Sequence, residues 1–414
     1  MKRRVVITGF GAISPLGNDW PSVKAKLLSQ TNAVQVIEQW KDIEGLRTRL
    51  GCPAADFDLP SDRFTRKTMR SMGRVALLAV RATDMALADA DIDKSLLRGG
   101  ELGIAYGSST GSPDSFSDIA NLISHHSTQG MNANTYIRMM SHTAPVNIGV
   151  FFGIKGRIIT TSSACTSSSQ AIGYAFETIQ SGKQKVMIAG GSEELHVSGS
   201  ATFDTLFATS TEYNDRPSLS PRPYDAARDG LVIGEGAGTL ILEELEHALA
   251  RGAKIYAEIV GFGTNSDGTH ITNPQSEQMA QAMRLALKDA DLAPETIGYV
   301  NTHGTATDRG DEAESHATFA VFGGAVPVST LKSYMGHTLG ACGALEAWMS
   351  IQMMNEGWFC PTINLTQRAP ECAALDYIVN EPRRIETDYV MSNNFAFGGI
   401  NTSLIFRRWA NSQE

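Results

Sequence analysis

The sequence predicts an α/β protein built from two similar layered halves. Segment 158–179 begins as an apolar, β-branched strand and ends as a helix, and the change falls among small residues. Segment 326–356 repeats this order, with an apolar strand, a polar glycine-containing turn and then a helix. Repetition of one supersecondary unit predicts two halves related by pseudo-two-fold symmetry, with Cys165 and His337 at equivalent places.

Composition and charge indicate a folded protein with more than one core. The chain has 414 residues, of which 42% are hydrophobic and 19% are charged, and a chain of this length favours two domains. We place the N-terminal half at 1–252 and the C-terminal half at 253–414. The formal net charge of −9 argues against a general nucleic-acid binder, which needs a basic surface. It leaves room for a local basic patch that binds an acidic partner.

The cysteines predict a reducing compartment, which we take to be the cytoplasm. There are five, they form no CxxC pair, and their odd number does not suit a disulfide framework. They stand at positions 52, 165, 342, 360 and 372. The chain also lacks a run of about 18 apolar residues, so we expect no transmembrane helix.

Seven further elements are predicted up to residue 260 besides the segment at 158–179, and the last of them opens the second half. Strands are expected at 4–13, 102–107, 184–192, 238–243 and 254–260, and helices at 75–90 and 244–251. The strand at 4–13 carries Gly9-Phe-Gly11, which superficially resembles a dinucleotide-binding loop. The third glycine is missing at the required spacing, so a nicotinamide-dependent oxidoreductase is a disfavoured alternative.

In the second half, the predicted strands end at polar turns. Strands are expected at 299–302, 326–331 and 403–406, and a helix at 341–356. The first of these strands leads directly into His303, and the second leads into the turn that carries His337. Active groups collect at the carboxyl ends of parallel strands. We therefore expect a parallel sheet that brings Cys165, His303 and His337 together.

A basic run precedes the helix at 75–90. Five cations fall within twelve positions: Arg63, Arg66, Lys67, Arg70 and Arg74. Their i, i+4 spacing predicts that Arg66, Arg70 and Arg74 share one face of a helix. Such a run is usually a solvated face, and the functional alternative is a docking patch for an acidic protein.

Cys165 is the candidate nucleophile. It stands where the strand of 158–179 changes to a helix, with Ser163, Ala164 and Ser167 leaving room around the sulfur. A thiol at the first turn of a helix lies at the positive end of the macrodipole, which predicts that the thiolate is favoured. The alternative is a small buried cysteine that merely fits a tight turn.

Two histidines distinguish the predicted chemistry from that of a cysteine hydrolase. A cysteine protease needs one histidine as base and an orienting Asn or Asp. Here His303 and His337 each lie in a glycine-rich turn. Two neutral imidazoles can both donate N–H bonds to a developing enolate oxygen. The set therefore suits carbanion chemistry on a thioester, with Cys165 holding the other acyl group.

Over essentially its whole length the sequence resembles the elongating β-ketoacyl-acyl-carrier-protein synthases. Four motifs carry the resemblance: Ser163-Ala-Cys165-Thr-Ser, Val300-Asn-Thr-His-Gly-Thr-Ala-Thr, Lys332-Ser-x-x-Gly-His337 and Asn394-Phe-Ala-Phe-Gly-Gly-Ile-Asn401. The resemblance implies the thiolase fold, with five layers in the order αβαβα. It also implies a decarboxylating Claisen condensation between an acyl chain on Cys165 and malonyl-carrier protein, in fatty acid or specialised polyene or polyketide synthesis.

The resemblance assigns further roles residue by residue. The catalytic set would be Cys165, His303, His337 and Lys332, with support from Glu346 and Asn401. The backbone N–H groups of Cys165 and Phe397 would form the oxyanion hole, and Phe397 would also be a gate. Thr305 and Thr307 would contact the phosphopantetheine arm, and Thr110 and Phe203 would line the acyl pocket. The docking patch for the acidic carrier protein would be Arg66, Lys67 and Arg70.

The resemblance also implies the partners. The acyl groups would arrive on the phosphopantetheine of acyl carrier protein, with no other cofactor. The chain would form a homodimer, or a heterodimer with a chain-length-factor-like subunit. A monovalent cation near Asn301 and Glu346 fits the resemblance, although nothing in the residues demands a metal. Two other members of the fold are alternatives: a non-catalytic chain-length partner, disfavoured by Cys165 with its two histidines, and a biosynthetic thiolase.

Departures from the family pattern bear on the substrate. Ala396 stands where many relatives carry Gly, Thr110 where an apolar pocket residue is frequent, and Phe207 where relatives place a basic docking residue. Segment 132–145, near the expected dimer contact, matches poorly. These differences favour an unsaturated, aryl or polyketide-like chain over a saturated fatty acyl chain.

Overall fold

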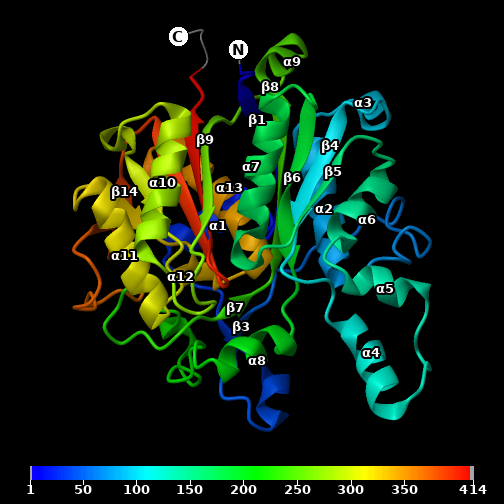
Figure 1. Ribbon diagram of the computed structural model, residues 1–414, viewed down its shortest axis with the longest axis horizontal. Coiled ribbons are helices and arrows are strands. Elements are labelled where there is room, and N and C mark those ends of the chain that lie inside the picture. Colours follow the sequence, from blue (N-terminus) through cyan, green and yellow to red (C-terminus); the bar gives the residue numbers. More distant parts are fainter. Residues whose placement is uncertain (1, 411–414) are drawn as a thin grey trace.

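Two α/β halves meet in one eleven-stranded sheet (Figure 1). The structure is a computed structural model that describes residues 2–410. From the centre outward, the first half contributes β1 (Val5–Ile13), β8 (Gly236–Glu244), β6 (Val186–Glu193), β4 (Leu102–Gly107) and β5 (Ile158–Thr161). The second half contributes β9 (Ala257–Ser266), β16 (Ile400–Arg408), β15 (Tyr389–Ala396), β10 (Tyr299–Asn301), β11 (Pro327–Ser329) and the outer strand β13 (Asp376–Tyr377).

The sheet is mixed, so the prediction of a parallel sheet is wrong. Strands β5, β4 and β6 run parallel, as do β13, β11, β10 and β15. Strand β8 is antiparallel to both β6 and β1, and β16 is antiparallel to both β15 and β9. The two halves join where β1 pairs antiparallel with β9. Each half therefore has a parallel outer part, where strand ends can carry functional groups, and an antiparallel inner part.

Helices form three layers around the two parts of the sheet, which gives the five predicted layers (Figure 1). Helices α2 (Arg74–Asp89) and α6 (Thr143–Phe152) cover the outer face of the first half. Helix α10 (Ser276–Ala290) covers β9 and β16 in the second half, with α11 (Asp308–Phe322) packed beside it. Helices α7 (Ser167–Gln180) and α13 (Cys342–Glu356) pack on each other between the halves.

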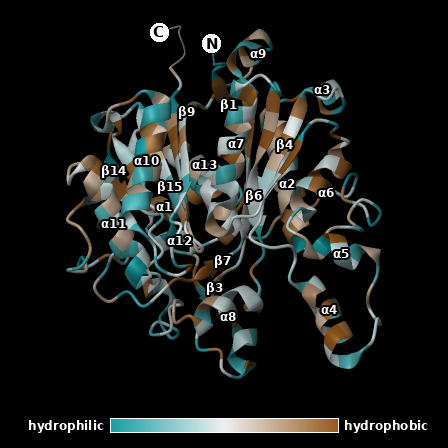
Figure 2. Cartoon of the chain, viewed as in Figure 1, coloured by the Kyte–Doolittle hydropathy of each residue, from teal (hydrophilic) through white to brown (hydrophobic). Residues whose placement is uncertain are grey.

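The central layer is buried because the apolar residues predicted for it face inward. Ala171, Ile172, Ala175, Phe176 and Ile179 on α7 are all buried, as expected from their helical spacing. Most residues of α13 are buried as well. The strands β1 and β4 are predominantly hydrophobic, whereas α10 and α11 carry hydrophilic residues (Figure 2). The halves thus share a core that runs through the middle of the molecule.

Several elements were not predicted. They are α1 (Trp20–Leu28), α4 (Asp114–His125), α5 (Ala133–Met139), α6, α8 (Val197–Thr205), α10, α11 and β15. Most are surface helices with mixed polar composition, whose stability comes from tertiary packing rather than from a strong local pattern. The smaller unpredicted elements are β2 (Gln35–Val36), β3 (Leu50–Cys52), β7 (Ile233–Gly234), β12 (Trp358–Phe359), β14 (Arg383–Arg384), α3 (Lys94–Arg98) and α12 (Lys332–Met335). The short helix α9 (Leu245–Ala250) confirms the one predicted at 244–251. Among residues 2–410, none of the helices has the length and apolar character needed to span a bilayer.

The repeat is present, but the predicted equivalence of Cys165 and His337 is wrong. A 3-10 turn precedes each central helix: Ala164–Thr166 before α7 and Leu339–Ala341 before α13. Both turns begin with a left-handed residue, with φ of 51° at Ala164 and 45° at Leu339. This backbone match makes Gly340 the counterpart of Cys165. His337 lies three residues earlier, in the approach to the second turn.

Candidate active site

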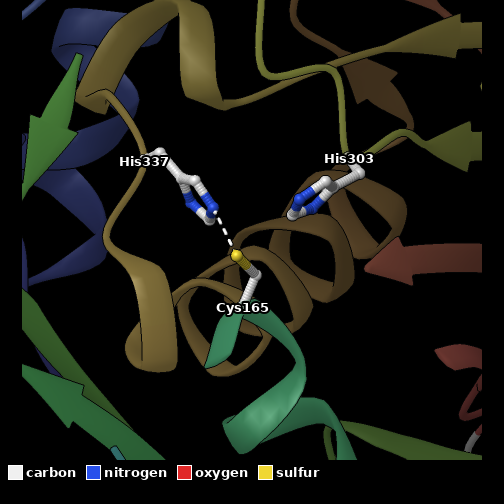
Figure 3. A group of neighbouring side chains, drawn as sticks. All are labelled: Cys165, His303 and His337. Atoms are coloured by element: carbon white, nitrogen blue, oxygen red, sulfur yellow. Dashed lines mark hydrogen bonds between the residues drawn. The ribbon is translucent and has the colours of Figure 1, made fainter. Parts of the chain in front are cut away.

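Cys165 lies at a cavity of about 470 Å³ where the two halves meet. The thiol is buried, and its Sγ lies 3.0 Å from Nε2 of His337 (Figure 3). The strained Ala164 immediately before it turns the chain sharply from β5 into α7. The sulfur is thereby held in the 3-10 turn between the strand and the helix.

His303 completes a cluster of three side chains. It follows β10, and its ring lies 5.0 Å from the His337 ring, centroid to centroid, at an interplanar angle of 89°. The sulfur and one nitrogen of each imidazole all lie within 4.8 Å of one another. Both rings face the sulfur from above (Figure 3). The fold thus brings Cys165, His303 and His337 together from three separate turns.

Both imidazoles are held in the neutral form. Burial, followed by the positive charge of Lys332, lowers the pKa of each histidine well below its usual value. The amide Nδ2 of Asn394 lies 3.4 Å from Nδ1 of His303 and 2.7 Å from a carboxylate oxygen of Glu346. An amide that donates to Nδ1 leaves the proton of His303 on Nε2. His303 can therefore present an N–H donor on the side of the ring away from Asn394.

The predicted preference for thiolate at Cys165 is wrong for the unliganded protein. Burial raises the pKa of Cys165 to about 11. A hydrogen bond from the backbone N–H of Phe397 and the charge of Lys332 oppose this effect without cancelling it. Desolvation therefore outweighs the helix dipole. The thiol is the resting form, and deprotonation must accompany attack on a substrate.

A buried charged network lies behind the histidines. Lys332 Nζ bonds Glu346, and both side chains are essentially inaccessible to solvent. Burial opposes the charge on Lys332, but Glu346 more than offsets it and keeps the pKa of the ammonium above its usual value. Cys342 Sγ lies 3.2 Å from the carbonyl oxygen of Cys165. This network fixes a positive charge beside the three reactive groups without exposing it to water.

Most of the residues predicted to contact the substrate line the cavity, and one does not. Phe203, Phe397, Thr305, Thr307 and Asn401 line the cavity. The rings of Phe203 and Phe397 pack edge to face with centroids 6.0 Å apart, and the two threonine hydroxyls lie 2.9 Å apart. Asn401 donates to Asp267 and so ties β16 to the segment after β9. Thr110, predicted for the acyl pocket, does not line this cavity.

Comparison with known proteins identifies the family. The family model described as "Beta-ketoacyl synthase, N-terminal domain" matches residues 2–248, and "Beta-ketoacyl synthase, C-terminal domain" matches residues 256–366. The chain belongs to the β-ketoacyl synthase family. It is 38% identical over 412 residues to 3-oxoacyl-[acyl-carrier-protein] synthase 1 of Escherichia coli (strain K12), with 98% of this chain and 99% of the relative covered.

Solved structures agree with this assignment. A β-ketoacyl synthase from Burkholderia phymatum STM815 superposes with a TM-score of 0.97 at 57% identity, covering 99% of this chain and 100% of that one. The ishigamide ketosynthase/chain length factor gives a TM-score of 0.91 at 31% identity, with the same coverage. The fold is therefore the thiolase-like fold of ketosynthases, and the chain is a condensing enzyme of the acyltransferase class.

Sequence reasoning missed one carboxylate at the ketosynthase site. Glu314, on α11, accepts hydrogen bonds from the backbone N–H groups of His303 and Gly304 at 2.6 and 2.7 Å. The hydroxyl of Tyr224 donates to the same carboxylate at 2.8 Å. Burial raises the pKa of Glu314 to about 7. A side chain that acts on backbone groups leaves no motif of its own, which is why the sequence did not reveal it.

The basic run of the ketosynthase does not form the predicted helical face. Arg66, Lys67 and Arg70 lie in turns, since α2 begins only at Arg74. All three are solvent-accessible and, within residues 2–410, take part in no ion pair. Arg74 is instead bonded to the buried Glu235. Three of the five cations therefore remain free to meet a partner, and Arg74 has a structural role.

Proposed function

We propose that Cys165 of this condensing enzyme carries the acyl chain while His303 and His337 hold the malonyl thioester. The observation that carries this proposal is the convergence of the sulfur and two imidazole nitrogens within 4.8 Å at a cavity. Both imidazoles are neutral and can donate N–H bonds to one oxygen. A single thiol with two such donors suits decarboxylation better than peptide hydrolysis, which needs one histidine and its orienting partner.

In the first half-reaction, the sulfur of Cys165 attacks the carbonyl of an acyl thioester. The developing oxyanion accepts hydrogen bonds from the backbone N–H groups of Cys165 and Phe397. The carrier thiolate then leaves and takes up the proton that the Cys165 thiol releases, while the N–H of His337 at Nε2, 3.0 Å from the sulfur, stabilises the thiolate as it forms. The product is an acyl thioester on Cys165.

In the second half-reaction, the malonyl thioester loses CO2 and forms an enolate. His303 and His337 donate to the enolate oxygen, and the charge of Lys332 disfavours protonation of either ring. The enolate carbon then attacks the acyl carbonyl on Cys165, and the thiolate of Cys165 leaves and takes up a proton from solvent to restore the thiol. The 3-oxoacyl product remains on the carrier, two carbons longer than the chain that entered.

Acyl carrier protein is the proposed partner, and no dissociable cofactor is needed because the acyl groups arrive on its phosphopantetheine. Thr305 and Thr307, which line the cavity, would contact that arm. The exposed Arg66, Lys67 and Arg70 would attract an acidic carrier. We further propose a second subunit, either a copy of this chain or a chain-length-factor-like relative. The five free thiols support a reducing cytoplasm as the place of action.

The acyl chain is proposed to be unsaturated, aryl or polyketide-like. One feature of the cavity supports this. Phe203 and Phe397 offer aromatic faces and edges, against which a flat conjugated chain can stack.

Intact-mass analysis after incubation with a panel of acyl-carrier proteins tests the proposal. We expect an acyl adduct on wild type and none on Cys165→Ala, with the conjugated or aryl chains loading faster than saturated chains of equal length. Equal loading of saturated medium chains would overturn the proposed chain type. Absence of an adduct from every donor would overturn the nucleophile assignment for the isolated chain and favour the alternative of a non-catalytic partner subunit.

A further inference from the structure

Glu193 is a fully buried carboxylate that the reaction scheme above does not use. It is the last residue of β6, beside the turn that follows His337. Within residues 2–410 it forms no ion pair. Burial raises its pKa to about 7, and hydrogen bonds from Ser109, Gly340 and Thr110 oppose that rise. A buried carboxyl group is costly unless it is bonded, so its partners indicate what it does.

One oxygen of Glu193 bridges two turns. Its Oε2 accepts the backbone N–H of Ser109 at 2.9 Å and the backbone N–H of Gly340 at 2.9 Å. Ser109 lies just after β4, and Gly340 belongs to the 3-10 turn before α13. These turns come from opposite halves of the molecule. The carboxylate therefore bonds one half to the other at the level of the active site.

Both turns lead directly to reactive groups. Ser162 Oγ, three residues before Cys165, donates to the carbonyl of Ser109 at 3.3 Å. Gly340 lies three residues after His337 and is packed so closely that it has no room for a side chain. A Cβ there would lie 2.7 Å from the Ser109 nitrogen and 2.8 Å from Glu193 Oε2. The path from Glu193 to each reactive side chain is thus short and closely packed.

The geometry points to Glu193 as a positioning residue that holds the His337 turn against the Ser109 turn, which Ser162 connects to Cys165, and so supports the 3.0 Å contact between Nε2 and Sγ. The inference rests on the proposed function, because it assumes that this contact is used in catalysis. Its neighbour Glu194 provides a matched comparison. Burial also raises the pKa of Glu194 to about 7, but its surroundings are Asp114, Ser112, Glu235 and Arg74 rather than the catalytic turns.

Three variants separate the effect of the length of the Glu193 side chain from the effect of its charge. Glu193→Asp keeps the charge but withdraws the carboxylate by about 1.5 Å, so it cannot serve both turns. We expect its kcat to fall about tenfold or more, with KM for malonyl-carrier protein unchanged, since misplacement of a reacting group acts on the chemical step. Glu193→Gln keeps an oxygen in place and should retain most of kcat. Glu194→Gln should keep the wild-type kcat.

A second measurement does not depend on turnover. The alkylation of Cys165 by iodoacetamide at pH 8 reports on its contact with His337, whose Nε2 lies 3.0 Å from the sulfur. We expect the alkylation rate to change about threefold or more in Glu193→Asp, and to stay at the wild-type rate in Glu193→Gln and Glu194→Gln. Wild-type kcat in Glu193→Asp, or a wild-type alkylation rate in that variant, would overturn the inference. If Glu193→Asp does not fold, Gly340→Ala takes its place, because the added Cβ would lie 2.8 Å from Glu193 Oε2 and displace the same turn. Failure of wild type to load any acyl chain would instead refute the proposed function.

Discussion

At the residue scale, the surroundings of Cys165 decide its chemistry more than its place on a helix. The sequence correctly brings Cys165, His303 and His337 together, because each follows a strand end that carries a recognisable turn. It cannot reveal that burial leaves the thiol protonated, with a pKa of about 11. Nor can it reveal Glu193 and Glu314, which act on backbone N–H groups contributed by other segments. Such contacts depend on tertiary structure alone.

Replacement of Cys165 separates the two half-reactions. Cys165→Gln removes the nucleophile but leaves His303 and His337 able to stabilise an enolate. We expect condensation to be lost, by at least about a thousandfold, while malonyl-carrier protein is still decarboxylated. Product analysis by mass spectrometry of the carrier distinguishes acetyl-carrier from 3-oxoacyl-carrier. His303→Ala, as the comparison, should lose decarboxylation as well. Retained condensation in Cys165→Gln would contradict the assignment of the nucleophile.

The buried carboxyl of Glu194 predicts how stability depends on pH. Its pKa in the fold, about 7, is raised above the usual value by burial. The protonated form therefore favours folding: the stabilisation is complete below about pH 4 and is lost as the pH rises through 7. Glu194→Gln stays neutral at this position. Between pH 5 and pH 8 its free energy of unfolding should therefore fall less than that of wild type, by on the order of 1–2 kcal/mol.

Thermal unfolding at several pH values measures this effect. The exposed Glu212→Gln is the control and should follow wild type at every pH. Equal loss of stability in wild type and Glu194→Gln between pH 5 and 8 would show that Glu194 does not titrate in this range. Glu193 and Glu314 have similarly raised pKa values, so part of the wild-type dependence should persist in the variant.

At the element scale, the periodic apolar segments were predictable and the surface helices were not. The helix after Cys165 and the one after His337 have continuous apolar faces, and both occur as expected. Helices α10 and α11 are largely polar on their outer side, and their inner faces make sense only once the sheet is present. The mixed direction of the strands also escaped prediction, because strand direction depends on connections that a single strand does not encode.

At this scale, the close contact between α7 and β9 predicts how a substitution at Gly173 affects stability. A Cβ at Gly173 would lie 2.3 Å from ring atoms of Phe262, which belongs to the other half. Gly173→Ala should therefore lower the free energy of unfolding by about 1–3 kcal/mol despite the better helix propensity of alanine. Gly199→Ala on α8 is the matched control, since no atom lies within 4 Å of the added methyl. That variant should be neutral or slightly more stable.

Denaturant unfolding of both variants tests the packing argument. A Phe262→Leu background should recover part of the stability lost in Gly173→Ala, because the smaller side chain leaves room for the methyl group. If Gly173→Ala were as stable as Gly199→Ala, the close approach of α7 to the second half would not limit the sequence there.

At the scale of the whole molecule, the halves are related by strand order and by their matched turns, yet they contribute unlike groups. The first half supplies the nucleophile at Cys165, and the second supplies both histidines and Lys332. Gly340, the backbone counterpart of Cys165, carries no side chain, and its backbone N–H donates a hydrogen bond to Glu193. The repeat was predictable from the sequence, whereas this division of labour was not. The boundary at 252/253, between α9 and β9, stays a prediction.

The last prediction concerns the charge of the whole molecule. A protein of net charge −9 repels an acidic carrier, and a local basic surface must overcome this repulsion for the two to bind. Arg66, Lys67 and Arg70 lie exposed and without ion pairs in the described chain. Reversing all three to Glu should raise KM for carrier-bound substrate about tenfold or more and leave kcat within about twofold, since rim charges act on encounter. The wild-type KM should rise with salt, and the variant should lose this dependence. Lys94→Glu/Arg98→Glu on α3 changes exposed charge elsewhere and should change KM little. An equal rise of KM in both variants would assign the effect to net charge alone, and no rise in the triple variant would place the carrier on another surface.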